Sequence, residues 1–290
     1  MFTPDLLRGH RILVTGGGTG LGRDLAARFL ELGAELYLCG RRGGVVEATA
    51  QELMERHGGS VKARAVDIRD AAAVDELVQW IWEEGGPLTG LVNNAAGNFI
   101  SRTEDLSHRG FDAIANIVLH GTFYVTHSVG KRWIAGGHKG SVVSIVVTWI
   151  WTGSPFVVPS AMAKAGVHVM TRSLAVEWGR YGIRLNAIAP GTFPTEGMLK
   201  RLAPDGGERM ESANANPMGR HGEIHELQNL ATFLLADGCE WLTGQTIALD
   251  GGGHLLNAGS FGELLAWGDE EWRRAREAIQ SQNARDRAGR

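Results

Sequence analysis

The chain has 290 residues, of which 43% are hydrophobic and 21% charged, with a formal net charge of -3 at pH 7. This composition supports one large core, and the weakly acidic balance gives no basic field for binding a nucleic-acid backbone. Cys39 and Cys239 lie far apart without spacing for metal or redox chemistry, and no apolar run is long enough to span a membrane. We expect a cytoplasmic protein without a metal site, whose partner is a small molecule rather than nucleic acid or membrane.

Short apolar runs alternate with longer segments of helical periodicity along most of the chain, which is typical of parallel strands buried on both faces. The runs that predict strands are residues 11–15, 35–39, 61–66, 90–93, 141–147, 183–188 and 245–249. The segments that predict helices are residues 20–32, 45–56, 71–84, 111–133, 160–179 and 223–235. Right-handed crossovers between about seven such units predict a single-domain, Rossmann-type, doubly wound α/β fold, with helices on both faces of one parallel sheet.

Two segments interrupt this alternation. Residues 191–222 are rich in Gly, Pro and Asn, and their length and composition favour a lid over a binding site. Residues 254–290 form a C-terminal tail, in which the charged stretch 269–282 either packs on a neighbour or frays. Because no linker or repeat divides the remaining sequence, residues 1–253 are expected to form one domain.

A glycine-rich turn follows the first expected strand and opens the first expected helix. Residues 15–22 read TGGGTGLG, with Gly16, Gly20 and Gly22 spaced as Gly-x-x-x-Gly-x-Gly rather than Gly-x-Gly-x-x-Gly. Glycines let the backbone approach a pyrophosphate, which the helix N-terminus also attracts. The alternative, an ordinary glycine-rich loop, is disfavoured by the strand–loop–helix context.

Two arginines, Arg41 and Arg42, follow the second expected strand, where the adenosine ribose of a dinucleotide would lie. An acidic residue there would bind the ribose 2′-hydroxyl of NAD, whereas arginine pairs with the 2′-phosphate of NADP. The position therefore predicts NADPH as the cofactor. A solvated arginine pair at a strand end is the alternative.

Further motifs resemble those of the short-chain dehydrogenase/reductase family: VDIRD at residues 66–70, NNAAG at 93–97, Pro190-Gly191, and DGG at 250–252. With the glycine turn, they cover residues 7–253 in the family's order. This resemblance implies a set of cofactor contacts at the carboxyl ends of the strands. They are Gly16, Gly18, Thr19, Gly20, Leu21, Arg41, Arg42, Asp67, Ile68, Asn94, Ala95, Ala96, Lys164, Pro190, Gly191 and Thr192.

Two stretches are more particularly similar to 2,4-dienoyl-CoA reductases: NNAAGNFIS at residues 93–101 and FVVPSAMAKAG at residues 156–166. The resemblance implies NADPH-dependent reduction of an unsaturated fatty acyl-CoA. It also implies a homotetramer built on the helices at 111–133 and 160–179. The substrate-contacting positions that it implies are Phe99, Ser107, Trp149 and Arg201.

The catalytic positions depart from the family pattern. Most members carry Tyr-x-x-x-Lys on one helix, whereas residues 160–164 read SAMAK, and the usual Asn and Ser align with Val118 and Val147. The 2,4-dienoyl-CoA reductases instead use a tyrosine from the loop after the fifth strand, a position that aligns with Trp149. None of the tyrosines falls at either place; they are Tyr37, Tyr124 and Tyr181.

The catalytic groups implied by this resemblance are Asn98, Ser160 and Lys164. Hydride delivery to a conjugated thioester produces an enolate, so hydrogen-bond donors must face the developing oxyanion. Asn98 and Ser160 can donate there, Lys164 holds the nicotinamide ribose and adds positive charge, and water protonates the carbon. In the alternative, Lys164 only anchors the cofactor.

Several alternatives remain open at this point. His120 or His168 could supply the proton, although each is more simply a polar residue on a helix surface. Trp149 and Trp151 could wall an acyl pocket or pack at a subunit interface. The protein could also reduce another ketone or enone, such as a 3-oxoacyl thioester, or bind NADPH without catalysis.

Overall fold

The structure is a computed structural model that describes residues 1–194, 216–256, 264 and 266–288, with side chains described as far as Gln280. Within these residues, a seven-stranded parallel sheet has the order β3-β2-β1-β4-β5-β6-β7. The strand order reverses between β1 and β4, so the predicted doubly wound Rossmann-type fold is confirmed. The strands are β1 (Arg11–Thr15), β2 (Glu35–Gly40), β3 (Val61–Ala65), β4 (Gly90–Asn93), β5 (Gly140–Ile145), β6 (Ile183–Pro190) and β7 (Thr246–Leu249).

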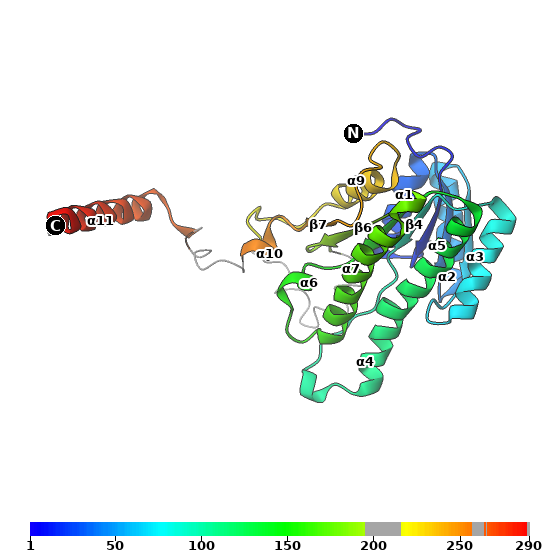
Figure 1. Ribbon diagram of the computed structural model, residues 1–290, viewed down its shortest axis with the longest axis horizontal. Helices are drawn as coiled ribbons and strands as arrows, with labels where there is room; N and C mark the ends of the chain where they lie inside the picture. The colour runs from blue at the N-terminus through cyan, green and yellow to red at the C-terminus, as the bar shows by residue number, and fades with distance from the viewer. Residues whose placement is uncertain (195–215, 257–263, 265, 289–290) are drawn as a thin grey trace.

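Helices cover both faces of the sheet (Figure 1). One face carries α1 (Gly20–Glu31), α2 (Gly43–His57) and α9 (Ile224–Leu235). The other carries α3 (Ala71–Gly85), α5 (Thr122–Gly136) and α7 (Val158–Trp178). Alternate residues of a strand point to opposite faces, so in β1 Ile12 and Val14 join the first core while Leu13 joins the second.

The single helix predicted over residues 111–133 has three parts. It begins as α4 (His108–Ala115), continues as a π-helical segment, η2 (Asn116–Gly121), and ends as α5. The start precedes the predicted one because Ser107 caps the helix, its hydroxyl oxygen accepting a hydrogen bond from the Gly110 N–H at 3.1 Å. The π segment brings Gly121 so close to Ile68 that a Cβ there would lie 2.7 Å from the isoleucine side chain.

The predicted fifth strand is two residues too long. β5 ends at Ile145, and the chain then turns, because the Val147 carbonyl accepts a hydrogen bond from the Ile150 N–H at 3.3 Å. A four-residue helix, α6 (Trp149–Thr152), follows directly. The other short elements are η1 (Thr103–Asp105), η3 (Gly179–Tyr181) and α10 (Gly253–Leu256).

The C-terminal tail ends in α11 (Asp269–Ala288), which projects away from the sheet and its helices (Figure 1). Trp267 and Trp272 pack edge to face at its start, with ring centroids 5.0 Å apart. Side-chain hydrogen bonds join residues four apart in its described part, as between Arg273 and Glu277. No helix in the described part of the chain is long and apolar enough to cross a membrane.

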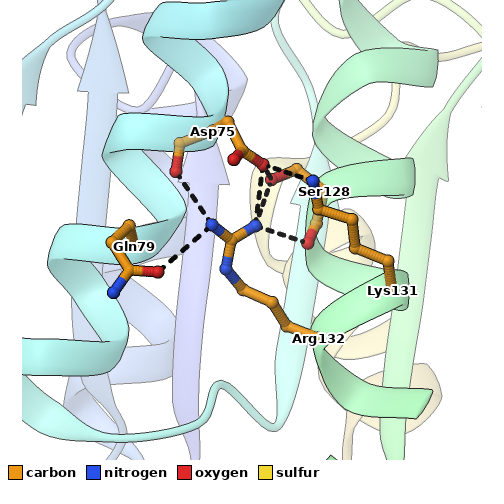
Figure 2. A network of polar contacts seen from close by, with 5 residues as sticks. All are labelled: Asp75, Gln79, Ser128, Lys131 and Arg132. Atoms are coloured by element: carbon orange, nitrogen blue, oxygen red, sulfur yellow. Dashed lines mark hydrogen bonds and ion pairs between the residues drawn. The ribbon is translucent and has the colours of Figure 1, made fainter. Parts of the chain in front are cut away.

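A polar network fastens α3 to α5 (Figure 2). The Asp75 carboxylate accepts hydrogen bonds from Ser128 Oγ at 2.7 Å and Arg132 Nη1 at 2.8 Å, and it pairs with Lys131 Nζ at 2.8 Å. Arg132 also donates to Gln79 Oε1 at 3.3 Å. The hydrogen bonds from Arg132, Lys131 and Ser128 hold the pKa of Asp75 far below its usual range.

Loss of Arg132 is expected to weaken this junction far more than loss of Lys131, because the Arg132 side chain is 16% exposed and that of Lys131 is 47% exposed. Arg132→Met should lower the free energy of unfolding by about 1–2 kcal/mol, and Lys131→Met by less than about 0.5 kcal/mol. Urea unfolding at pH 7 measures both. Since a depressed carboxylate pKa stabilises only while the group is ionised, the Arg132→Met deficit should shrink below about pH 4. Equal losses for the two variants would contradict this account.

Candidate functional site

The glycine-rich turn lies at the carboxyl edge of β1 and is tied to the end of β2 and to the loop after β4. Thr15 Oγ1 accepts hydrogen bonds from the N–H groups of Asn94 and Ala95, each at 3.1 Å. The Asn94 side-chain amide donates to the carbonyls of Thr15 at 3.0 Å and Gly16 at 3.3 Å. The Gly16 N–H donates to the Cys39 carbonyl at 2.8 Å. The turn is therefore held in place from both sides by the protein's own hydrogen bonds.

Glycine is required in this turn for steric reasons. Gly16 has φ +66°, and a Cβ on it would lie 2.9 Å from Ala95 Cα. A Cβ on Gly22 would overlap both the Gly16 carbonyl oxygen and the Asn94 side-chain nitrogen. Thr19, the N-cap of α1, makes no side-chain capping bond among the described residues, so the first N–H groups of α1 can bind an anion. These features fit the pyrophosphate of a dinucleotide.

The predicted adenosine contacts lie along the same edge, after β2 and β3. Arg41 and Arg42 are both exposed, and Arg42 is the N-cap of α2. Asp67 accepts hydrogen bonds from Arg69 Nε at 2.9 and 3.0 Å, and the side-chain hydrogen bond from Arg69 lowers the pKa of Asp67. Ile68 is buried in the core, so only its backbone can face a ligand. Arg69 is a residue that the sequence analysis missed; its only signal was a guanidinium two residues after the aspartate.

Lys164 and Ser160 lie one turn apart on the same face of α7, and both are buried. Lys164 Nζ donates a hydrogen bond to the carbonyl of Ile145, the last residue of β5. Desolvation lowers the pKa of Lys164 to about 8. A buried amine with a lowered pKa therefore lies at the carboxyl end of β5.

The loop that carries Asn98 is tied to the start of α7. The Ser101 N–H donates to the Phe156 carbonyl at 2.9 Å, two residues before α7 begins. Phe156 has φ +65°, a left-handed conformation that costs free energy in a residue with a Cβ. Asn98 Oδ1 accepts a hydrogen bond from the Phe99 N–H at 2.9 Å, which leaves its amide nitrogen as the group able to donate to a ligand.

Phe99 packs against a small core cluster formed by Ile114, Val118 and Ala163. Val118, which was predicted to align with the asparagine of other family members, is fully buried in this cluster. Phe99 therefore connects the loop after β4 to α4, η2 and α7, and its ring forms part of the packing beneath the predicted substrate site.

Two further predicted substrate contacts, Trp149 and Ser107, lie at the starts of different helices. Trp149 is the first residue of α6 and is partly exposed. Ser107 is exposed and acts as the N-cap of α4. Arg201 lies outside the described residues.

The three tyrosines do not gather at this edge. Tyr37 is buried in β2, and its hydroxyl donates to Glu35 Oε1, at the start of that strand, at 2.9 Å. Tyr124 lies in the first turn of α5, with its ring against Phe123. Tyr181 belongs to η3, just before β6 begins.

The segments after β6 and β7 close the far side of the site. A Cβ on Gly191 would lie 2.8 Å from Asp250 Cα, and the Thr192 carbonyl accepts a hydrogen bond from the Gly222 N–H at 3.0 Å. A small pocket lies between them, lined by Thr192 and Asp250 together with residues from 216–222. Of the predicted lid, 191–222, only residues 191–194 and 216–222 are described.

A family model for enoyl-(acyl carrier protein) reductase matches residues 16–254, which include the glycine turn, Lys164 and the segment after β7. The chain belongs to the short-chain dehydrogenase/reductase family. As a member, it is an oxidoreductase of a family that uses a nicotinamide adenine dinucleotide cofactor. The resemblance noted in the sequence is thus confirmed at the level of the family.

Relatives of this short-chain dehydrogenase/reductase include proteins named as 2,4-dienoyl-CoA reductases. A probable 2,4-dienoyl-CoA reductase of Caenorhabditis elegans is 41% identical over 97% of this chain and 93% of its own length. A probable 2,4-dienoyl-CoA reductase of Bacillus subtilis is 38% identical over 83% of this chain and 95% of its own. A solved short-chain dehydrogenase from Bacillus anthracis is 39% identical, with a TM-score of 0.76, covering 84% of this chain and 96% of that one.

Proposed function

We propose that this protein is an NADPH-dependent reductase of an unsaturated fatty acyl-CoA, acting on 2,4-dienoyl-CoA or a closely related thioester. The observation that carries the proposal is the hydrogen bond from Ser101 to Phe156, which ties the Asn98 loop to the helix bearing Ser160 and Lys164. The names of the relatives support the same substrate class.

In the proposed mechanism, the bound cofactor supplies a hydride. Reduction of a conjugated thioester places negative charge on its carbonyl oxygen, and preorganised donors stabilise that charge. The Asn98 amide and the Ser160 hydroxyl are the proposed donors. Lys164 would hold the nicotinamide ribose while its buried ammonium favours the oxyanion. Water would protonate the carbon, and the atypical feature of the site would be an indole, Trp149, where related reductases place a tyrosine.

The test is oxidation of NADPH in the presence of 2,4-dienoyl-CoA and simple enoyl-CoA substrates, followed by absorbance and by product mass. We expect turnover with at least the dienoyl thioester. A protein that binds NADPH tightly and reduces none of these substrates would overturn the proposal and favour a cofactor-binding role without catalysis. Faster turnover of an enone or ketone that is not a thioester would show that the substrate belongs to that class instead.

Trp149→Tyr is expected to raise kcat by about tenfold or more, because a phenol can transfer a proton that an indole cannot. The matched control is Trp149→Phe, which provides a ring of similar size to tyrosine without the hydroxyl. If tyrosine and phenylalanine change kcat equally, the effect comes from ring size, and proton transfer does not depend on this position.

The NADPH preference rests on Arg41 and Arg42, both exposed at the end of β2. Replacing both with alanine should reduce the ratio of NADPH to NADH affinity by about 100-fold, since charge-assisted hydrogen bonds to the 2′-phosphate are lost. Titration calorimetry with both cofactors measures this ratio. Arg8→Ala, an exposed arginine near the N-terminus, serves as the control. An unchanged ratio would mean that other groups select the cofactor.

We also propose that the protein is a homotetramer. The outer surface of α5 carries exposed Phe123, and α7 carries exposed Met162, Val169 and Val176. Apolar side chains exposed along two neighbouring helices are typical of a subunit interface. Light scattering should give a mass about four times that of the 31.2 kDa chain, and a monomer would contradict the proposal.

A further inference from the structure

A hydrogen-bonded pair, Asp250 and His254, follows β7 at the carboxyl edge of the sheet. The Asp250 side chain is 6% exposed, and its Oδ2 accepts hydrogen bonds from the His254 N–H at 2.7 Å and from His254 Nδ1 at 2.8 Å. Its Oδ1 accepts a third from the Gly252 N–H at 3.0 Å. The imidazole of His254 is therefore held in position by the Asp250 carboxylate, to which its Nδ1 can donate.

The indole of Trp151, in α6, lies between two such fixed imidazoles. It packs on His254 with ring centroids 5.0 Å apart and an interplanar angle of 32°, and it meets His168 edge to face at 6.4 Å. His168 is held in turn by a hydrogen bond of 2.8 Å between its Nδ1 and Thr246 Oγ1. Residues from α6, α7, β7 and α10 thus converge on one indole.

The short helix α6 is anchored by this contact and by Ile150, which packs against the cluster of Val146, Val167, Ala187 and Ala189. It has only four residues, and within the described structure none of them is fully buried and its N-cap makes no side-chain bond. Yet α6 follows β5 directly, next to the Ile145 carbonyl that binds Lys164. A shift of Trp151 would therefore move a wall of the region where the substrate must lie.

The predicted cofactor half of the site centres on the loops after β1 and β4, with a further predicted contact at residues 190–192 after β6. The segments after β5 and β7 carry no predicted cofactor contact and are left for the substrate. Trp151 lies in α6, the helix that follows β5, and the residue remains 43% exposed despite the two imidazoles. An indole offers a large apolar surface to a hydrocarbon chain. Its position would then limit how far an acyl chain can extend.

We propose that Trp151 forms the outer wall of the acyl-chain subsite, and that Asp250 and His254 are positioning residues that hold this wall and so set the preferred acyl length. This inference rests on the proposed function. His254 acts through Trp151 and does not touch the reacting atoms.

The test is a comparison of kcat/KM for 2,4-dienoyl-CoA substrates of increasing chain length in the wild type, Trp151→Ala, His254→Ala and the double variant. Trp151→Ala should raise the ratio of long-chain to short-chain kcat/KM by about tenfold, since one methylene in a fitted pocket is worth about that much. His254→Ala should shift the ratio in the same direction. The double variant should shift it no further than Trp151→Ala alone, because one residue acts through the other.

Three controls accompany this comparison. Leu255→Ala, an exposed neighbour in α10, should leave the length preference unchanged. Trp151→Phe retains a ring between the imidazoles and should keep most of the wild-type preference. If His254→Ala fails to fold, His254→Leu, which keeps the bulk but neither the ring nor the hydrogen bond, gives the same measurement. The KM for NADPH should stay within about twofold throughout, because the wall lies away from the cofactor half.

Multiplicative effects in the double variant, or a His254→Ala variant that slows all chain lengths equally, would overturn the inference while leaving the proposed function intact. Failure of the wild type to reduce any acyl-CoA is a different outcome. It is visible before any variant is compared, and it would remove the proposed function and the acyl subsite together.

Discussion

Lys164→Met is expected to remove reductase turnover and, at the same time, to make the cofactor-free protein more stable. The loss in kcat should be about 100-fold or more, the size typical of removing a group that acts in proton transfer or charge stabilisation. The gain in stability follows from burial. Lys164 is 6% exposed, and desolvation by burial lowers its pKa to about 8 from the usual 10.5.

The sign of the stability effect follows from proton binding. Between about pH 8 and pH 10.5 the unfolded chain binds more protons at this residue than the native protein, so stability rises with pH across that window. At pH 7 the native protein therefore contains a charged, buried ammonium at a cost of about 3 kcal/mol. The hydrogen bond to the Ile145 carbonyl compensates part of the free energy lost when the ammonium leaves water. Methionine has a side chain of similar length but no charge, so the substitution removes this cost without leaving a large cavity.

We expect Lys164→Met to raise the free energy of unfolding at pH 7 by about 1–3 kcal/mol and to flatten its rise between about pH 8 and 10.5. Chemical unfolding at several pH values, without cofactor, measures both effects. Lys131→Met, which changes an exposed lysine, should show neither. A Lys164→Met variant that is less stable than the wild type at every pH would mean that the ammonium is better solvated than its burial indicates.

Gly22→Ala is expected to weaken cofactor binding by about 100-fold and to lower the melting temperature, although alanine normally favours a helix over glycine. Gly22 lies in the first turn of α1, and a Cβ there would overlap the Gly16 carbonyl oxygen and the Asn94 side-chain nitrogen. These two atoms are themselves joined by a hydrogen bond of 3.3 Å. The new methyl group must therefore separate the glycine turn from the loop after β4.

The control for this variant is Gly179→Ala. Gly179 follows α7 with φ -55° and ψ -37°, and a Cβ there would meet no atom within 4 Å. It should leave cofactor affinity unchanged and alter stability by less than about 1 kcal/mol. Calorimetric titration with NADPH and thermal unfolding compare the two. Unchanged affinity in Gly22→Ala would mean that the turn can open without loss of its binding geometry.

Most of the fold could be predicted from the sequence, because buried parallel strands are short apolar runs and the helices between them have strong periodicity. The predictions that were wrong concern the end of β5 and the short or irregular helices, which amino-acid composition hardly distinguishes. β5 ends two residues early, at a turn made by backbone hydrogen bonds, and α6 is too short for periodicity to reveal. The π-helical segment η2 differs from its neighbours only in backbone hydrogen bonding, so the residues there read as ordinary helix.

The parts of the candidate site that are formed by contiguous motifs could be predicted from the sequence, and the contacts between distant residues could not. The glycine turn and the Ser160-to-Lys164 spacing are contiguous in sequence and could be identified directly. The meeting of Trp151 with His254 could not, because these residues are about 100 positions apart and no pattern connects them. Asp67 was expected to contact adenine, but its engagement by Arg69 depends on side-chain conformation.

The number of residues in the π-helical segment determines which side of α4 faces the site. A π-helical turn holds one residue more than an α-helical turn, so α4 is rotated by about 100° relative to a continuous α-helix through α5. Ile114 of α4 reaches the Phe99 cluster in that rotated register. Deleting one residue of this segment other than Val118 would therefore turn a different side of α4 toward the substrate region and leave the side chains of the Phe99 cluster unreplaced.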